Sequence, residues 1–236
     1  METAKALQEL GPDIWIAEGD CVSFYGFPYP TRSVVVRLGN GDLWVWSPIA
    51  LSPDLKQAVD ALGSVRHLVS PNKIHHLYLQ DWARDYPQAK IWGPASTAAK
   101  RSDISFQPPL TDTAPPDWAG EIEQIHVTGS TAMDEVVFFH RPSRTLILAD
   151  LSENFSKAFL RAEWGRWKAW VAGLWGIVEG KGYAPLEWRL SFLNRTPLKR
   201  AKARMLDLNP KAVIMAHGEW QRDNGRDYVQ RAFRWV

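Results

Sequence analysis

Three short apolar runs, each ending in residues that can bind a metal, constrain the fold of this 236-residue chain more than any other feature. They are HLVSPNKIHHLYL (67–79), RTLILADLSEN (144–154) and KAVIMAHGEW (211–220). In each run, a stretch typical of a buried strand stops at histidine or aspartate. The ends of interior strands meet at one edge of a sheet, where binding sites usually form. The sequence therefore predicts a site built from strand ends.

Four residues in these runs are candidate metal ligands. His75 and His76 are neighbours at a strand-to-helix junction, Asp150 ends a predicted strand, and His217 ends another. Imidazole and carboxylate groups are suitable ligands for zinc, iron or manganese. An adjacent pair of histidines alone is weak evidence, because most such pairs lie on surfaces or cap helices. The matching contexts of Asp150 and His217 strengthen it.

Hydrophobic periodicity predicts strands and helices that alternate in both halves of the chain. Strands are predicted over residues 14–17, 33–38, 43–46, 67–69, 90–92, 123–127, 135–140, 145–149 and 212–215. Helices are predicted over 52–62, 77–85, 198–208 and from about 223 onwards. This pattern is typical of two sheets with helices outside. We expect a single α/β domain over residues 1–236, a length that one large core can fill.

The order and spacing of the three runs resemble the metallo-β-lactamase superfamily. In that family a strand ends in His-x-His-x-Asp-His, a later hairpin supplies another histidine, and strands ending in Asp and in His-Gly complete a two-metal site. Within the superfamily, PNKIHH, EVVFFHRPSRTLILAD and AHGEW resemble a subgroup classed only as a domain of unknown function. The resemblance spans nearly the whole chain and implies a metallo-β-lactamase-like four-layer αββα sandwich.

The family's ligands for the first metal are missing from this sequence. The motif reads Pro71-x-Lys73-x-His75-His76, so proline and lysine stand where two histidines would hold the first metal. The third histidine should precede the EVVFF strand, where Thr131 or a neighbour takes its place.

The positions for the second metal are largely retained. His76, Asp150 and His217 match the family, and His75 replaces its aspartate. Three imidazoles and one carboxylate can hold a single divalent cation in roughly tetrahedral geometry. The resemblance implies zinc, with iron or manganese as alternatives. Lys73 would then stand beside Asp150, neutralise the face of that carboxylate which otherwise bridges two metals, and stabilise developing negative charge.

The remaining titratable residues near these runs are predicted to be mainly structural. His140 lies in a strand-turn-strand and is expected to cap the turn, His126 alternates with apolar neighbours in a strand, and His67 belongs to the same class. Glu135 begins the EVVFF strand at the edge where the lost histidine would have stood. The alternative to a structural role for Glu135 is that it approaches the cation or Lys73.

A Trp-rich helical insert is predicted at about residues 155–208. Its apolar residues fall at helical spacing and form one wide face: Trp164, Trp167, Val171, Leu174, Trp175 and Val178. This face would pack on the sandwich or on a second subunit, which would make a homodimer. The alternatives are a lid over the site and a helix that lies on a membrane surface.

Charge is distributed unevenly along the chain. Residues 151–211 contain 12 Lys and Arg against 5 Asp and Glu, whereas the rest contains 16 against 21. Such asymmetry can attract an anionic substrate, a lipid or a nucleic acid. No recognised nucleic-acid motif accompanies it, so nucleic acid is not expected.

The single cysteine, Cys21, excludes an internal disulfide. Residues 1–13 have no apolar core of signal-peptide length, and no apolar run is long enough to span a membrane. The predicted location is cytoplasmic.

Two hypotheses of function follow from these features. The first is a metal-dependent hydrolase with one bound cation, which lowers the pKa of a bound water and polarises a scissile carbonyl or phosphoryl group. Asp150 is then a ligand or the base that orients the water, and the substrate is a small molecule, an anionic one being favoured by the basic insert. The second is a catalytically inactive binding domain with a vestigial metal site. A redox role that uses iron is a third option.

Overall fold

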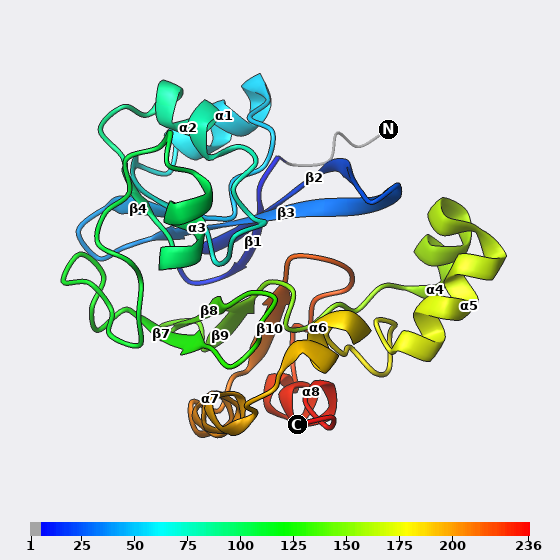
Figure 1. Cartoon of the computed structure of the whole chain (residues 1–236). Helices are drawn as coiled ribbons and strands as arrows, with labels where there is room; N and C mark the ends of the chain where they lie inside the picture. The colour runs from blue at the N-terminus through cyan, green and yellow to red at the C-terminus, as the bar shows by residue number, and fades with distance from the viewer. Residues whose placement is uncertain (1–5) are drawn as a thin grey trace.

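The computed structural model describes residues 6–236, and within them two β-sheets pack face to face (Figure 1). The first sheet has six strands in the order β1 (Gln8–Gly11), β2 (Ile14–Phe24), β3 (Phe27–Arg37), β4 (Asp42–Trp46), β5 (Ser64–Val69) and β6 (Lys90–Trp92). The second has four strands in the order β10 (Ala212–Met215), β9 (Thr145–Leu148), β8 (Glu135–His140) and β7 (Ile122–Val127). Because β9 and β10 are parallel, their carboxyl ends lie at the same edge.

The alternation of apolar side chains along each strand explains why the sheets pair. Side chains at successive positions point to opposite faces of a strand. Trp44 and Trp46 of β4 are buried between the sheets, whereas Val45 lies on the outer face. Alternate residues from both sheets fill the space between them, among them Ile14, Ile16, Val34, Val36, Val136, Phe138, Ile147 and Ile214.

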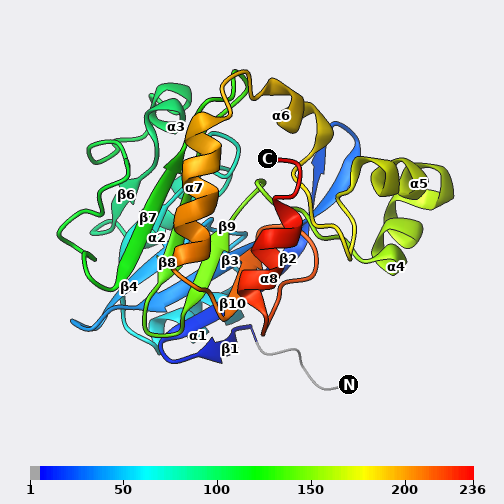
Figure 2. The ribbon, with the colours of Figure 1, turned by 90° about the horizontal axis from the view of Figure 1, so that it is seen from below.

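Helices cover both outer faces and give four layers (Figures 1 and 2). On the first sheet, α1 (Pro53–Asp60) and α2 (Leu79–Asp85) cover the outer apolar residues, and α3 (Ala95–Lys100) follows β6. On the second sheet, α7 (Thr196–Asp207) and α8 (Gly225–Ala232) bury its outer face. The predicted αββα sandwich is confirmed.

The hairpin between β2 and β3 is longer than the sequence predicted. The pairing continues from Ile14 and Val36 to Phe24 and Phe27, well beyond the predicted 14–17 and 33–38. Tyr25 and Gly26 form the turn, and both have positive φ, as a two-residue hairpin turn of this kind requires. The prolines and polar residues of 18–32 break the apolar alternation, which is why the pattern did not reveal the extension.

The insert forms several short helices beside the sandwich. These are α4 (Lys157–Phe159), a π-helical turn (Leu160–Trp164), α5 (Gly165–Trp175) and α6 (Leu186–Ser191). In Figures 1 and 2, α4 and α5 project from one side of the two layers. The predicted apolar face is divided, since Trp164 and Val178 are buried while Trp167 and Leu174 are exposed.

Two predictions concern the relation of the chain to membranes and compartments. In residues 6–236 no helix has the length and apolar character needed to cross a bilayer. The first five residues of the segment assessed for a signal peptide lie outside the described residues. The cytoplasmic location stays a prediction.

Candidate metal centre

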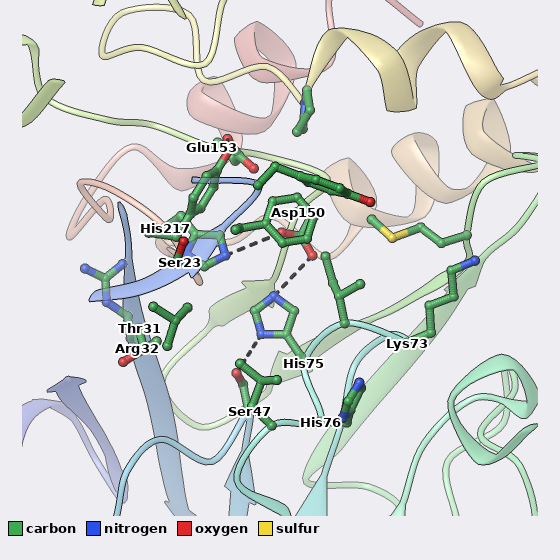
Figure 3. A pocket seen from close by; sticks show the side chains of 18 of the residues that line it. Ser23, Thr31, Arg32, Ser47, Lys73, His75, His76, Asp150, Glu153 and His217 are labelled. Atoms are coloured by element: carbon green, nitrogen blue, oxygen red, sulfur yellow. Dashed lines mark hydrogen bonds and ion pairs between the residues drawn. The ribbon is translucent and has the colours of Figure 1, made fainter. Parts of the chain in front are cut away.

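The predicted site lies in a cavity of about 500 Å³ at the edge where β5, β9 and β10 end. His75 follows β5, Asp150 follows β9 and His217 follows β10, so the structure places each at a strand end as predicted. Figure 3 shows the three side chains pointing toward one another. Most of the wall around them is apolar, with Phe24 and Trp188 on it.

The three side chains are spaced closely enough to share one ion. His75, Asp150 and His217 each offer one ligand atom, and these three atoms all lie within 4.8 Å of one another. Within residues 6–236, this is the group of side chains that meets the spacing for a shared ion. The His75 Nε2 to Asp150 Oδ2 distance is 3.1 Å, and the His217 Nε2 to Asp150 Oδ1 distance is 3.5 Å. Ligands about 2.1 Å from a tetrahedral zinc ion lie about 3.4 Å from one another. The donor set therefore fits a zinc-sized cation.

A second contact orients each imidazole toward the shared point. His75 Nδ1 lies 2.8 Å from the hydroxyl of Ser47, and His217 Nδ1 lies 2.8 Å from the carbonyl oxygen of Pro30. Histidines that ligate metals nearly always place the other ring nitrogen on such a partner, because it fixes the ring and its tautomer. In both residues the free Nε2 faces Asp150.

The contact between His217 and Asp150 requires a positive charge. A carbonyl oxygen can only accept a hydrogen bond, so the Nδ1 atom of His217 carries the hydrogen that it donates to Pro30. A neutral ring then presents the lone pair of Nε2 to the Asp150 carboxylate, and the two repel. A second proton on the ring or a bound cation removes this repulsion, so the pair is suited to holding either.

Asp150 is held by an amide that the sequence did not single out. Asn72 Nδ2 donates to Asp150 Oδ2 at 2.7 Å and to Glu135 Oε2 at 3.2 Å. Its Oδ1 accepts from the backbone N–H groups of Ile74 and His75. Asn72 thus fixes the turn that carries His75 and the carboxylate that His75 faces. An asparagine after proline at a strand end was the available signal, because asparagine often bonds to the backbone two residues on.

Glu135 acts on the backbone and approaches neither a cation position nor Lys73. It is fully buried, and its carboxyl accepts hydrogen bonds from the backbone N–H groups of Ala149, Asp150 and Leu151. These bonds fix the turn in which Asp150 leaves β9.

The two neighbouring carboxyls have pKa values that are displaced in opposite directions. Burial, and then the charge of Asp150, raises the pKa of Glu135 to about 8. Burial would also raise the pKa of Asp150, but the imidazoles of His75 and His217 outweigh it and hold that pKa well below its usual range. Asp150 therefore carries the negative charge of the site.

His76, predicted as a fourth ligand, is not part of the cluster. Its Nδ1 lies 3.1 Å from Nη1 of Arg101, which also donates to the His76 carbonyl. Burial, together with the charges of Lys100 and Arg101, lowers the pKa of His76. His75 and His76 are adjacent residues in a backbone turn, so their side chains point to different sides. This is why only His75 faces Asp150. Figure 3 shows His76 pointing away from Asp150.

The positions that lack the first-metal histidines make structural contacts instead. The Lys73 ammonium donates to the carbonyl oxygen of Ala132, and in Figure 3 it points away from Asp150. Asn72, rather than Lys73, contacts the Asp150 carboxylate. The Pro71 carbonyl accepts from Val136 N at 2.8 Å, and Thr131 N donates to the Ser191 carbonyl at 3.0 Å.

The three histidines predicted to be structural have partners outside the cluster. His140 Nδ1 lies 2.8 Å from the Ser143 hydroxyl in the turn that it was expected to cap. His126 Nε2 lies 2.7 Å from Asp134, and His67 Nδ1 accepts from the indole of Trp92.

A second buried carboxyl group lines the cavity and was missed in the sequence. Glu153 is 2% exposed, and the Tyr29 hydroxyl lies 3.5 Å from its Oε2. Burial, and then the charges of Asp150 and Glu187, raises the pKa of Glu153 well above its usual value. Burial thus favours the protonated form of Glu153 more strongly than it would in water, and the Tyr29 hydroxyl donates to its carboxyl. It follows Asp150 by three residues, but nothing in its sequence context indicated burial.

The family model described as Domain of unknown function (DUF4336) matches residues 13–159. This match covers more than half of the chain. The chain belongs to the DUF4336 family. The matched region includes His75 and Asp150 but ends before His217. No curated protein matches the chain.

Solved structures show which fold this DUF4336 protein adopts. A metallo-β-lactamase from Erythrobacter litoralis matches with a TM-score of 0.66 and 10% identity, over 95% of this chain and 92% of that one. The DIM-1 metallo-β-lactamase matches with a TM-score of 0.62 and 16% identity, over 95% and 93%. A metallo-β-lactamase from Pontibacter korlensis matches with a TM-score of 0.60 and 15% identity, over 95% and 98%. The DUF4336 chain therefore has the metallo-β-lactamase fold.

Proposed function

We propose that this protein is a metal-dependent hydrolase with a single-ion site formed by His75, Asp150 and His217. The observation that carries the proposal is the convergence of the three side chains, each oriented by a partner of its own. Zinc is the proposed ion, with iron or manganese as alternatives, because two imidazoles and a carboxylate suit all three. Three protein ligands leave a coordination position free, as in catalytic zinc sites.

The proposed substrate is a small molecule with an apolar part and a scissile carbonyl or phosphoryl group. The cavity volume of about 500 Å³ and its apolar wall support this class. A bound divalent cation would supply an acidified water and polarise the scissile group. Lys73 and Lys100 line the cavity together with Asp150, Glu153 and Glu187, and the two ammonium groups are the proposed contacts for an anionic group of the substrate.

The side chains of the cavity have distinct proposed roles. His75 and His217 bind through Nε2, and Asp150 binds through its carboxylate. Glu153 is the proposed hydrogen-bond donor to the leaving group or to a substrate oxygen, because burial raises the pKa of its carboxyl well above the usual value. Lys73 stabilises negative charge only after its ammonium leaves the Ala132 carbonyl.

A substrate screen with matched variants tests the proposal. Esters, thioesters, lactones and phosphodiesters are tested with added zinc, manganese or iron. His217→Ala is expected to abolish the metal-dependent activity, whereas His126→Gln, which removes a histidine outside the cluster, keeps it. Activity that persists in His217→Ala would discredit the hydrolase, because that activity would come from elsewhere.

The second candidate is a catalytically inactive binding domain that keeps the cavity. The observation in its favour is that His76 and Lys73, two of the predicted site residues, contact Arg101 and Ala132. This candidate predicts a ligand that binds the cavity with equal affinity in wild type and in Asp150→Asn, and no turnover in the screen above.

A further inference from the structure

Three large apolar side chains are exposed side by side on helix α5. Trp167 is 69% exposed, Trp170 61% and Leu174 63%. Their spacing of three and four residues places them on one face of the helix, and the rings of Trp167 and Trp170 stack with centroids 6.0 Å apart. We call these three residues the α5 aromatic patch. Contiguous exposed apolar groups of this kind mark an interaction surface.

The α5 aromatic patch is not the face that attaches the helix to the rest of the protein. The opposite side of α5 is buried, with Ala172 packed in a small core that includes Phe155 and, from the π-helical turn, Trp164. The indole N–H of Trp164 also donates to the Pro28 carbonyl in the β2–β3 hairpin at 2.9 Å. The helix is therefore held in place without the patch.

The lid hypothesis for this helix is not supported by its position. Among the described residues that line the cavity, none belongs to α5. In Figure 1, α4 and α5 stand at the side of the molecule, beyond the tip of the β2–β3 hairpin. The α5 aromatic patch therefore does not cover the cavity.

The chain around the patch is basic. Residues 155–182 contain five Lys and Arg against two Asp and Glu. Lys157, Arg161, Arg166 and Lys181 are exposed. An isologous contact between two copies of this face would bring like charges together, which costs energy. An anionic surface complements the same charges.

We propose that the α5 aromatic patch docks this protein on an anionic membrane surface. Tryptophan suits the boundary between headgroups and acyl chains, because its large apolar ring carries one polar N–H. Basic side chains beside it attract anionic lipid headgroups, and a helix with this distribution lies in the plane of the interface. The patch binds there while the rest of the sandwich stays in water.

Vesicle sedimentation of the full chain tests the proposal. Two lipid compositions are used, pure phosphatidylcholine and the same lipid with about a third phosphatidylglycerol. Wild type is expected to sediment with the anionic vesicles and to be released as salt rises. The variant Trp167→Ser/Trp170→Ser/Leu174→Ser is expected to bind about tenfold more weakly or worse, because it loses the apolar area that inserts.

Two further variants separate the apolar and electrostatic parts. Arg161→Glu/Arg166→Glu is expected to lose the preference for anionic vesicles. Leu190→Ser/Leu193→Ser is the control, since these residues are 67% and 81% exposed but lie outside α5. It is expected to bind like wild type. Circular dichroism confirms that each variant is folded, which the exposure of all the changed side chains leads us to expect.

Four results would overturn the proposal. They are no sedimentation of wild type, equal sedimentation with both lipid compositions, loss of binding in the Leu190→Ser/Leu193→Ser control, and self-association of wild type that the patch variant abolishes. The last result, seen by light scattering, would assign the patch to a second copy of this chain.

Discussion

On one side of the cavity, His75, Asp150 and His217 each have a partner that aims them at the same point. On the first-metal side, the Lys73 ammonium contacts the Ala132 carbonyl, and the Thr131 backbone N–H donates to the Ser191 carbonyl. Both sides occupy places where the resembling family has metal ligands. They differ in whether a second layer of contacts orients the side chain.

This difference separates the one-ion site that we propose from the two-ion pattern of the resembling family. Residues at the first-metal positions of the resembling family make structural contacts in this chain, as when the Pro71 carbonyl accepts a hydrogen bond from Val136. His75, Asp150 and His217 have orienting partners, of which Ser47 and Asn72 are buried and costly to leave unpaired. We expect changes on the ordered side to cost stability or metal affinity, and changes on the other side to cost little.

The largest expected effect is that of Glu135→Ala. The change leaves the buried N–H groups of Ala149 and Asp150 without an acceptor, which should lower the free energy of unfolding by about 3 kcal/mol. Urea denaturation measures it. Glu123→Ala is the control, since Glu123 only pairs with Arg141 at the surface and should cost less than about 1 kcal/mol. Equal losses would show that Glu135 does not brace the site.

His140, at the end of β8 away from Glu135, should make the free energy of unfolding depend on pH without involving the proposed metal site. Burial lowers the pKa of His140 to about 4, against an ordinary value of about 6.5. The neutral form is thus favoured in the folded state, so the stabilisation is present above pH 6.5 and is lost as pH falls toward 4. Between pH 7 and pH 5 the loss should be about 2 kcal/mol. His140→Asn should show a correspondingly shallower decline in urea denaturation, and an unchanged slope would contradict the assignment.

Ser47→Ala tests the second contact of His75. Removing the hydroxyl that lies 2.8 Å from His75 Nδ1 should weaken zinc binding by about tenfold, because the ring loses its orientation. Competition with a chromogenic chelator measures the affinity. Ser130→Ala, which removes a hydroxyl that lies 2.7 Å from that of Ser191 and outside the cluster, should leave it unchanged. A smaller loss of zinc affinity in Ser47→Ala than in Ser130→Ala would contradict the role of Ser47 in orienting His75.

The smallest expected effect is that of Lys73→Ala. Since the Lys73 ammonium contacts the Ala132 carbonyl and not Asp150, zinc affinity should change by less than about twofold. The same chelator competition measures it. A tenfold change in either direction would mean that Lys73 acts on the site, as the sequence first suggested.

The strand ends could be predicted from the sequence, whereas the direction of neighbouring side chains could not. Apolar runs that stop at histidine or aspartate located His75, Asp150 and His217 without any structure. The choice between His75 and His76 depends on the turn that Asn72 and Ser70 hold, with Ser70 Oγ donating to the carbonyls of Asn72 and His75. Such a turn is set by contacts between distant strands, which periodicity does not report.

The insert shows a similar limit. Helical spacing predicted one wide apolar face, but Gly165 has a φ of 78° and separates the π-helical turn from α5. Trp164 and Trp167 therefore belong to different helical segments and face different surroundings. In the structure the tryptophans of this predicted helix are divided between the π-helical turn and α5. The break could not be inferred, because glycine tolerates both helical and positive φ.

Metal analysis of the untagged chain, purified without chelator, tests the central claim most directly. We predict close to one equivalent of a divalent ion in wild type and in His76→Ala, and its loss in His75→Ala and His217→Ala, because only the last two remove a member of the cluster. Less than about a tenth of an equivalent in wild type would contradict a metal site. Loss of the ion in His76→Ala alone would contradict the ligand set.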